Sequence, residues 1–252
     1  MQSNHVVLVL VLTILMTTVH AQKKKPQDLP FQKFTYKTKS DTLPYALLAP
    51  VDKTQKYPLI IFLHGKAERG KDNVQQLSHV QILFNANTYA KYPCIVLAPQ
   101  CPQKYFWSDL VSNKKLTRSP APPLQMVVDV MEKIIKEYPV DTSRIYVTGV
   151  SMGGFATWEL ISRFPERFAA AVPVCGGGDE TVAAKFKTLP IWAFHGAEDE
   201  VVSPARSRVM VDALQAAGAS PGYTEYPGVK HNSWTWAYKE PHLLPWLFKQ
   251  KK

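Results

Sequence analysis

The sequence predicts an α/β fold: a doubly wound, mostly parallel sheet with an antiparallel N-terminal edge. Short and nearly continuous apolar runs recur along the chain, as is typical of strands buried on both faces of a sheet. These runs cover residues 59–63, 94–98, 145–148, 169–174 and 191–194. Amphipathic helical patterns separate several of the runs, and strands that alternate with helices build βαβ units and a parallel sheet.

The edge of the sheet comes from two segments with a different pattern. Residues 31–39 and 43–49 alternate apolar and polar side chains, so we expect two antiparallel strands there. A last strand is expected at residues 222–226, near the end of the chain.

Three helices are expected between the strands. The clearest covers residues 122–138, where apolar side chains recur at spacings of three and four. Another covers residues 151–163. A third begins at Ser203-Pro204, an N-cap followed by a first-turn proline, and ends at Gly218.

The composition is that of a globular protein with one core. The chain has 252 residues, of which 46% are hydrophobic and 20% charged, and a chain of this length buries roughly 70–75% of its unfolded surface. Disordered and collagen-like classes are excluded. We expect a signal peptide at residues 1–21, a flexible lead-in at 22–30 and a single domain at 31–252.

The N-terminal residues carry the pattern of a targeting segment. Residues 6–16 are apolar except for Thr13, and this stretch is shorter than the roughly 20 residues that span a bilayer. Val19-His20-Ala21 offers a cleavage site, so we predict cleavage after Ala21, no stable membrane insertion afterwards, and a secreted or periplasmic protein. An uncleaved anchor stays open as the alternative.

The positive charge lies mostly at the ends of the chain. The formal net charge is +10, and six lysines are terminal: Lys23, Lys24, Lys25, Lys249, Lys251 and Lys252. Subtracting these six from ten leaves +4 for the rest, which is unexceptional. No nucleic-acid partner is therefore expected.

The three cysteines do not form a framework. Cys94, Cys101 and Cys175 are too few and too scattered for a disulfide-rich fold or a zinc site. If residues 94–98 form a strand, extended chain separates Cys94 from Cys101 by about 20 Å, beyond bridging distance. We expect no disulfide between them and buried thiols at Cys94 and Cys175.

The motif with the strongest functional content is Thr148-Gly149-Val150-Ser151-Met152-Gly153-Gly154. It follows a strand pattern and opens a helix, which is the setting that a nucleophile elbow requires. Glycine at 149 and 153 lets strand and helix approach closely. Ser151 is the predicted nucleophile at the carboxyl end of the sheet, where open α/β folds bind ligands. The alternative is a helix-starting serine beside a glycine turn.

A serine nucleophile needs a base and an orienting acid, which follow it in the order Ser, Asp or Glu, His. The loop after the strand at 191–194 supplies Asp199 as the predicted acid, with Glu198 and Glu200 as alternatives. His231 follows the last strand and is the predicted base.

The other histidines fit this place less well. His64 and His195 each precede a glycine at a strand end, which suits a structural role in which they hold a loop by hydrogen bonds. His79 and His242 lie outside any motif.

Acyl transfer also needs donors for the developing oxyanion, and two backbone N–H groups suffice. One is expected from Met152, next to the nucleophile. The other is expected from Lys66, in the loop of residues 64–70 that follows a predicted strand.

Together these residues resemble the α/β-hydrolase superfamily, and within it secreted bacterial esterases and predicted peptidases close to the prolyl oligopeptidase catalytic domain and the dienelactone hydrolases. The likeness covers about residues 31–249. It depends on residues 64–70, 98–102 with Trp107 downstream, 144–154, 195–202 and 231–234. The family pattern after His-Gly is Ala-Gly-Glu-Arg-Gly, and Lys66-Ala67 replaces its first two residues. A positive φ required at Ala67 would shift this loop.

The resemblance implies a serine hydrolase. Ser151 would attack an ester carbonyl with His231 as general base, and water would then hydrolyse the acyl-enzyme, while Asp199 orients and stabilises the imidazolium. No metal or cofactor is needed. Ser151 stands where a true dienelactone hydrolase has cysteine, which argues against that activity.

Three functions are compatible with these residues. The leading one is a carboxylesterase acting on small or carbohydrate-linked esters, with acetyl or feruloyl groups, whose partner is a small-molecule or glycan ester. The runner-up is a secreted serine peptidase of prolyl oligopeptidase type. A non-catalytic glycan-binding module comes third, because the triad pattern is intact.

Aromatic and basic residues near these motifs are candidates for the substrate pocket. Trp107, Trp234 and Trp236 offer flat faces suited to sugars and aryl groups, although core packing explains each equally well. Lys66 could attract acidic substrates or simply be solvated. The oligomeric state is left open by the sequence.

Overall fold

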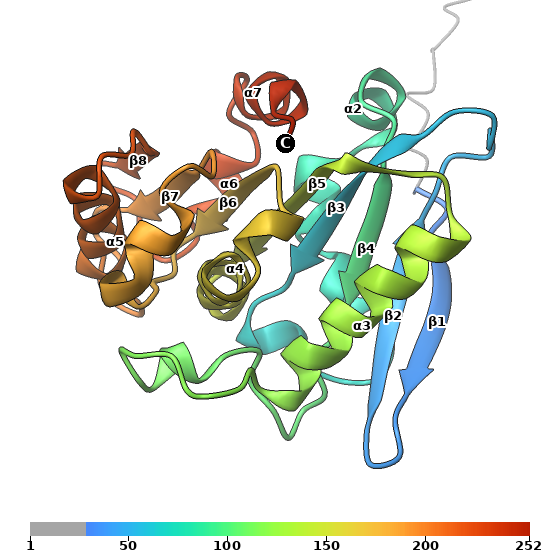
Figure 1. Cartoon of the computed structure of the whole chain (residues 1–252), viewed down its shortest axis with the longest axis horizontal. Coiled ribbons are helices and arrows are strands. Elements are labelled where there is room, and N and C mark those ends of the chain that lie inside the picture. The colour runs from blue at the N-terminus through green and yellow to red at the C-terminus, as the bar shows by residue number, and fades with distance from the viewer. Residues whose placement is uncertain (1–28) are drawn as a thin grey trace, which may run out of the picture.

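An eight-stranded sheet forms the centre of the computed structural model, which describes residues 29–252 (Figure 1). The strands are β1 (Gln32–Lys37), β2 (Thr42–Leu48), β3 (Tyr57–Leu63), β4 (Ile95–Pro99), β5 (Val140–Val150), β6 (Ala170–Val174), β7 (Trp192–Gly196) and β8 (Gly222–Tyr226). Their order in the sheet is β1-β2-β4-β3-β5-β6-β7-β8. The predicted signal peptide and most of the lead-in lie outside the described residues.

The sheet is parallel except at one edge. β1 pairs antiparallel with β2, and β2 pairs antiparallel with β4, whereas all other neighbours are parallel. β3, β4 and β6 are buried along their whole length, as expected of strands covered on both faces, while β1 is largely exposed. The predicted fold class, with its antiparallel N-terminal edge, is confirmed.

The helices are α1 (Val80–Leu83), α2 (Ala86–Lys91), α3 (Pro122–Glu137), α4 (Met152–Arg163), α5 (Ala205–Ala216), α6 (Trp234–Ala237) and α7 (Leu243–Lys249). The three helices predicted from the sequence correspond to α3, α4 and α5. The other four were not predicted, because they are short and their apolar residues cover at most two turns.

Helices cover both faces of the sheet and give it two separate hydrophobic cores. One core packs α3, α4 and α5 against the sheet, with Leu124, Trp158 and Leu214 among its buried residues. The other packs α1, α6 and α7 against the opposite face. In Figure 1, α3 and α4 lie in front of the sheet. Between residues 29 and 252, no helix is both long enough and apolar enough to cross a membrane.

The three cysteines are buried and free. Cys94 immediately precedes β4, and Cys101 lies beyond its other end. An extended strand therefore separates them, as the sequence predicted.

Parallel pairing brings four loops together at the carboxyl ends of the strands. Leu63 at the end of β3 pairs with Gly149 near the end of β5, and Gly196 at the end of β7 pairs with Tyr226 at the end of β8. The loops that leave these strands contain all the residues predicted to carry chemistry, so the topology gathers them in one place.

Candidate active site

Ser151 occupies a sharp turn between β5 and α4. Its backbone has φ 53° and ψ −114°, a strained conformation for a residue with a side chain, and its N–H donates to the carbonyl oxygen of Val174 (3.0 Å). A Cβ on Gly153 would overlap the backbone carbonyl of Leu63, and one on Gly149 would overlap the backbone of Gly153. The sequence prediction that glycine permits this close approach is confirmed.

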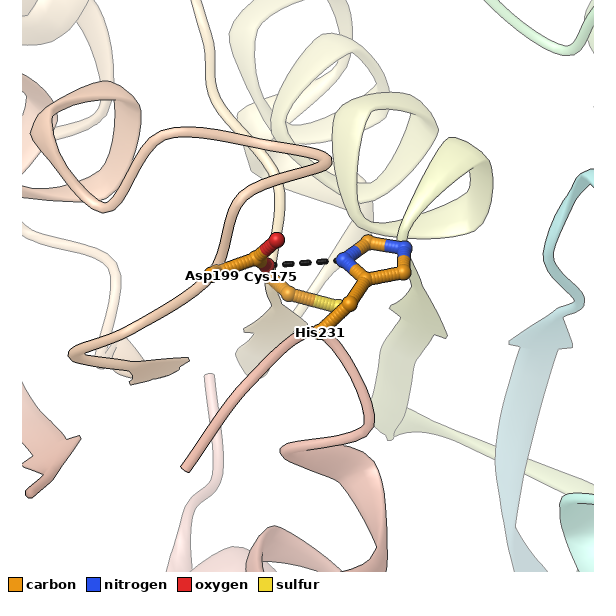
Figure 2. Close-up of side chains that lie close together, drawn as sticks. All are labelled: Cys175, Asp199 and His231. Atoms are coloured by element: carbon orange, nitrogen blue, oxygen red, sulfur yellow. Dashed lines mark hydrogen bonds and ion pairs between the residues drawn. The ribbon is translucent and has the colours of Figure 1, made fainter. Parts of the chain in front are cut away.

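His231 lies between Ser151 and Asp199. It belongs to the loop after β8, and its Nε2 atom is 2.9 Å from Oγ of Ser151, which donates to it. Its Nδ1–H donates to Oδ2 of Asp199 across 2.7 Å (Figure 2). The three side chains come from three different loops and form one continuous line of hydrogen bonds.

Asp199 is fixed by its own loop. Its side chain is buried, and Oδ1 accepts hydrogen bonds from the backbone N–H groups of Val201 and Val202, both at 2.9 Å. Oδ2 is thereby directed at His231. The alternative acid Glu200 points away, with its side chain 80% exposed and 3.8 Å from Lys230. The structure brings Asp199, and not this acidic neighbour, to the histidine.

His195 packs behind Asp199 with all of its side chain buried. Its Nε2 atom lies 2.9 Å from the carbonyl oxygen of Val202 and 3.2 Å from Oδ2 of Asp199, and its Nδ1 atom lies 2.8 Å from Oγ of Ser207. Burial lowers the pKa of His195 below its ordinary value, which favours a neutral ring. These contacts agree with the structural role predicted for this histidine.

His64 ties together the ends of β3 and β4. Nδ1–H donates to the carbonyl oxygen of Gly65 (2.6 Å), and Nε2 accepts from the N–H of Cys101 (2.9 Å). Burial lowers the pKa of His64 to about 4, so the ring is neutral at physiological pH. This is again the loop-holding role that the sequence predicted.

The two expected oxyanion donors each begin a helix. Met152 is the first residue of α4, and Lys66 is the first residue of a short 3-10 helix, Lys66–Glu68. The N–H of a first helical residue has no acceptor inside its helix, so both donors are free for a ligand in this respect. Ala67 lies within the 3-10 helix and does not have a positive φ, so replacing the family's glycine there causes no strain.

A cavity of about 560 Å³ opens beside Ser151. Its lining combines residues of the loops after β3, β5, β7 and β8 with others from the segments before α1 and after β4. They are Gly65, Lys66, Ala67, Glu68, Arg69, His79, Gln103, Val150, Ser151, Val201, His231 and Trp234. A volume of this size is typical of a small-molecule site.

The tryptophan candidates divide between the cavity and the rest of the molecule. Trp234 lines the cavity, and its ring lies edge-on to His231 with centroids 5.3 Å apart. Trp107 is fully buried, and its Nε1–H donates to the carbonyl oxygen of His64 (3.2 Å), so the prediction that it lines the pocket is wrong. Trp236 is exposed and is not part of the lining.

His79 and Glu68 line the cavity, although neither was proposed as a site residue from the sequence. His79 stacks on Trp234 with centroids 5.0 Å apart, and Glu68 lies with Oε1 3.7 Å from Nε2 of His79. His79 belongs to no motif, and its contact joins segments that are far apart in the chain. Only the three-dimensional arrangement shows that it reaches the cavity.

Among the described residues, Cys175, Asp199 and His231 form a group that could be considered as a metal site. Their possible ligand atoms lie within 4.8 Å of one another (Figure 2). However, Nδ1 of His231 and Oδ2 of Asp199 are already joined by a hydrogen bond. Burial also raises the pKa of Cys175 to about 12, which keeps its thiol protonated, whereas a metal needs the thiolate. The group fits a hydrogen-bonded pair beside a neutral thiol better than a metal centre.

The fold and the cavity at the carboxyl ends of its strands define a protein of the α/β-hydrolase superfamily. Within it, the chain belongs to the dienelactone hydrolase family, whose model matches residues 109–238. This match includes Ser151, Asp199 and His231.

Curated relatives match over parts of their own length. A bifunctional acetylxylan esterase/xylanase of Neocallimastix patriciarum is 28% identical over 156 residues, covering 62% of this chain and 21% of that protein. A probable acetylxylan esterase A of Neosartorya fischeri is 28% identical over 127 residues, covering 49% of this chain and 34% of that protein. The chain thus spans about a fifth to a third of the length of these relatives.

Solved structures show the same fold. A crystal structure of a thermostable esterase superposes with a TM-score of 0.82 and 41% identity over 88% of this chain and 63% of that one. An acylaminoacyl peptidase of Pyrococcus horikoshii gives a TM-score of 0.67 at 16% identity, over 88% of this chain and 42% of that chain. The second likeness shows the fold alone.

Proposed function

We propose that this chain is a serine carboxylesterase that hydrolyses small or carbohydrate-linked esters through an acyl-enzyme. The observation that carries the proposal is the continuous hydrogen-bonded line from Oγ of Ser151 through His231 to Asp199, beside a cavity of substrate size. The three residues act as nucleophile, general base and orienting acid.

In the first half of the reaction, Oγ of Ser151 attacks the ester carbonyl and its proton passes to Nε2 of His231. The resulting imidazolium is stabilised by Asp199, which its loop amides hold as an acceptor. Charge develops on the carbonyl oxygen, and the N–H groups of Met152 and Lys66 are the proposed donors that stabilise it. His231 then protonates the leaving alcohol.

In the second half, a water molecule takes the place of the alcohol. His231 removes its proton, the hydroxide attacks the acyl-enzyme, and the carboxylic acid leaves as Ser151 regains its proton. The site residues supply all of these proton transfers, and no metal or cofactor takes part in them.

The substrate class is supported by the relatives. Two of the similar proteins are named as acetylxylan esterases, and the solved structure with 41% identity is described as an esterase. Acetyl groups on sugars are therefore the first substrates to test, followed by feruloyl groups. The acylaminoacyl peptidase likeness is confined to the fold, so a peptidase activity remains the second candidate.

Hydrolysis of dienelactone is not part of the proposal. The nucleophile position holds Ser151, whereas the resemblance implies cysteine for that activity. Cys175 does not replace it, because its thiol is buried and its pKa is raised to about 12.

We further propose that residues 1–21 are a signal peptide, which makes the protein secreted or periplasmic, and that residues 31–252 form one catalytic domain. An uncharacterized secreted protein of Arthroderma benhamiae is 24% identical over 259 aligned residues, covering 86% of this chain and 26% of that protein. N-terminal sequencing of the exported protein should begin at Gln22.

The function is tested with purified protein and short-chain 4-nitrophenyl esters. The wild type should hydrolyse them and be labelled by a fluorophosphonate probe, and Ser151→Ala should lose both properties. Equal rates for the two proteins would exclude the mechanism. Amino-acyl amides measured in parallel decide between the two candidates, because amide cleavage comparable with ester cleavage would favour the peptidase.

A further inference from the structure

Glu68 is a nearly buried carboxylate without a hydrogen-bond partner, and it lies in the cavity beside Ser151. Its side chain is 13% exposed, and its Oε2 atom is buried and receives no hydrogen bond from any described residue. Oε1 lies 3.7 Å from Nε2 of His79, which is beyond hydrogen-bonding distance. Oε2 is enclosed by the protein, whereas Oε1 is not, so Oε1 is the oxygen that a donor on a ligand in the cavity can reach.

His64 lies near Oε2 of Glu68 but does not donate a hydrogen bond to it. Nδ1 of His64 lies 3.9 Å from Oε2 of Glu68, but its proton is directed to the carbonyl oxygen of Gly65, 2.6 Å away. Since burial keeps His64 neutral, it has no second N–H to offer.

The basic neighbours of Glu68 are turned elsewhere. Arg69 donates to the backbone carbonyl oxygens of Lys66, Gln103 and Tyr105 at 3.0 to 3.1 Å, and its guanidinium lies 4.6 Å from the ring centre of Phe106. The ammonium group of Lys66 also lies over Phe106, at 5.7 Å. Within residues 29–252, no lysine or arginine nitrogen comes within 4.0 Å of the Glu68 carboxylate.

His79 and Trp234 connect Glu68 to the candidate catalytic histidine. The rings of His79 and Trp234 are stacked with an interplanar angle of 18°, and Trp234 meets His231 edge-on. Glu68, His79, Trp234 and His231 therefore follow one another along the wall of the cavity. A ligand whose ester lies at Ser151 can extend along this wall to Oε1 of Glu68, the carboxylate oxygen on the side of His79.

We infer that Glu68, with Nε2 of His79, forms a hydroxyl-binding subsite that selects esters of sugars and other polyols carrying a free hydroxyl next to the ester. A carboxylate oxygen accepts up to two hydrogen bonds, so Oε1 can bind a hydroxyl donor of the alcohol, and the imidazole adds one further polar contact. Lys66 and Arg69 in the same lining make it net positive, which disfavours an ammonium group as the ligand. This inference rests on the proposed esterase function and names the alcohol part of its substrate.

The test compares three esters. The first is a monoacetate of methyl β-xyloside, the second is its analogue without the hydroxyl next to the ester, and the third is acetylcholine, which carries a cation instead. The wild type should prefer the first over the second by about tenfold in kcat/KM, as one hydrogen bond to a charged acceptor allows.

The variants remove the subsite in different ways. Glu68→Ala should reduce this preference to near one, and Glu68→Gln, which keeps the volume should Ala disturb the loop, should reduce it severalfold. His79→Phe keeps the stack on Trp234 but removes Nε2, so it should lower the preference partly. Glu200→Gln is the matched control, because this acid is outside the cavity lining and 80% exposed, and its preference should equal that of the wild type.

An unchanged preference in both Glu68 variants would overturn the subsite, as would a selective loss of acetylcholine hydrolysis, which would indicate an amine-binding carboxylate instead. Hydrolysis of 4-nitrophenyl acetate by the wild type and not by Ser151→Ala tests the proposed function separately. If the wild type hydrolyses no ester at all, both the function and the subsite are wrong.

Discussion

Nε2 of the buried His195 lies 3.2 Å from Oδ2 of Asp199, the same carboxylate oxygen that accepts the hydrogen bond from His231. The carboxylate is therefore held from two directions, by the loop amides on Oδ1 and by His195 behind Oδ2. In a neutral His195 the Nε2–H donates to the carbonyl oxygen of Val202 (2.9 Å), so the ring fixes this loop and packs against Oδ2 without adding a charge that would compete with the imidazolium. We regard it as a positioning residue for Asp199.

Replacing His195 should reduce turnover more than binding. In His195→Ala, Val202 and Ser207 each lose a hydrogen-bond partner and Asp199 loses a buried contact, so the protein should lose about 1–3 kcal/mol of unfolding free energy and several-fold in kcat, with KM little changed. Urea unfolding and steady-state kinetics measure the two effects. His195→Gln restores one donor and should recover part of kcat. A fall in stability with kcat unchanged would show a purely structural role.

Asp199 should be the acid that turnover requires. In Asp199→Asn, Nδ1 of His231 loses its charged acceptor and the ring its correct tautomer, so kcat should fall by about 10³ to 10⁴. Glu200→Gln should change kcat less than twofold, because the Glu200 side chain is 80% exposed and points away from His231. Steady-state hydrolysis of a 4-nitrophenyl ester measures kcat of both variants. Comparable losses in the two variants would contradict the assignment.

The elbow should not tolerate a side chain at Gly153. In Gly153→Ala the new methyl group would overlap the carbonyl oxygen of Leu63, which is backbone and cannot rotate away, so we expect insoluble protein or a loss of at least about 3 kcal/mol. Gly70→Ala is the control, because its nearest neighbour is a side-chain atom, Nε2 of Gln100 at 3.1 Å, and not backbone. Soluble yield and thermal unfolding compare them. Equal stability of the two variants would contradict the close packing.

The elbow and the sheet were predictable because they depend on local patterns. Thr148 to Gly154 combines a strand ending with glycines spaced around Ser151 and a helix start, and this spacing in its strand-to-helix setting specifies the turn. Asp199 and His231 could be predicted in the same way, because they follow Ser151 in the expected order and each lies in a loop after a predicted strand. Parallel pairing then brings these loops together without further information.

The wall of the cavity was not predictable from such patterns. His79 reaches the site by stacking on Trp234, a contact between distant segments whose side chains give no periodic signal. Trp107 shows the opposite error: it lies near the family motifs in sequence, yet its indole packs on His64 in the core. The sequence around an aromatic residue does not show whether its ring lies in the core or in a pocket, because this depends on tertiary packing.

All three thiols should be unreactive in the native protein. Burial raises the pKa of Cys101 and of Cys175 to about 12 and raises that of Cys94 further, so no thiolate is available at pH 8. Ellman's reagent should therefore titrate close to no thiol before unfolding and three in guanidinium chloride. Rapid labelling of the native protein that Cys175→Ser abolishes would show that the thiol beneath Ser151 is accessible.

Stability should fall on mild acidification because of His64. Its pKa is about 4 in the folded chain and 6.5 as the ordinary value, so between these pH values the unfolded chain binds more protons than the native one. The stabilising contribution is complete above pH 6.5 and is lost as the pH falls towards 4, by about 3 kcal/mol. The pKa of Asp141 is lowered to about 2, so its stabilising contribution is lost only as the pH falls below its ordinary value of 3.8.

Urea unfolding followed by tryptophan fluorescence from pH 4.5 to 8 measures this loss. His64→Gln offers an amide donor near Gly65 and an acceptor near Cys101 but does not titrate, so its unfolding free energy should depend less steeply on pH in this window. His195 also has a lowered pKa and contributes in the same direction, so some slope should remain in the variant. Identical slopes for the variant and the wild type would show that His64 is not the group whose protonation opposes the fold.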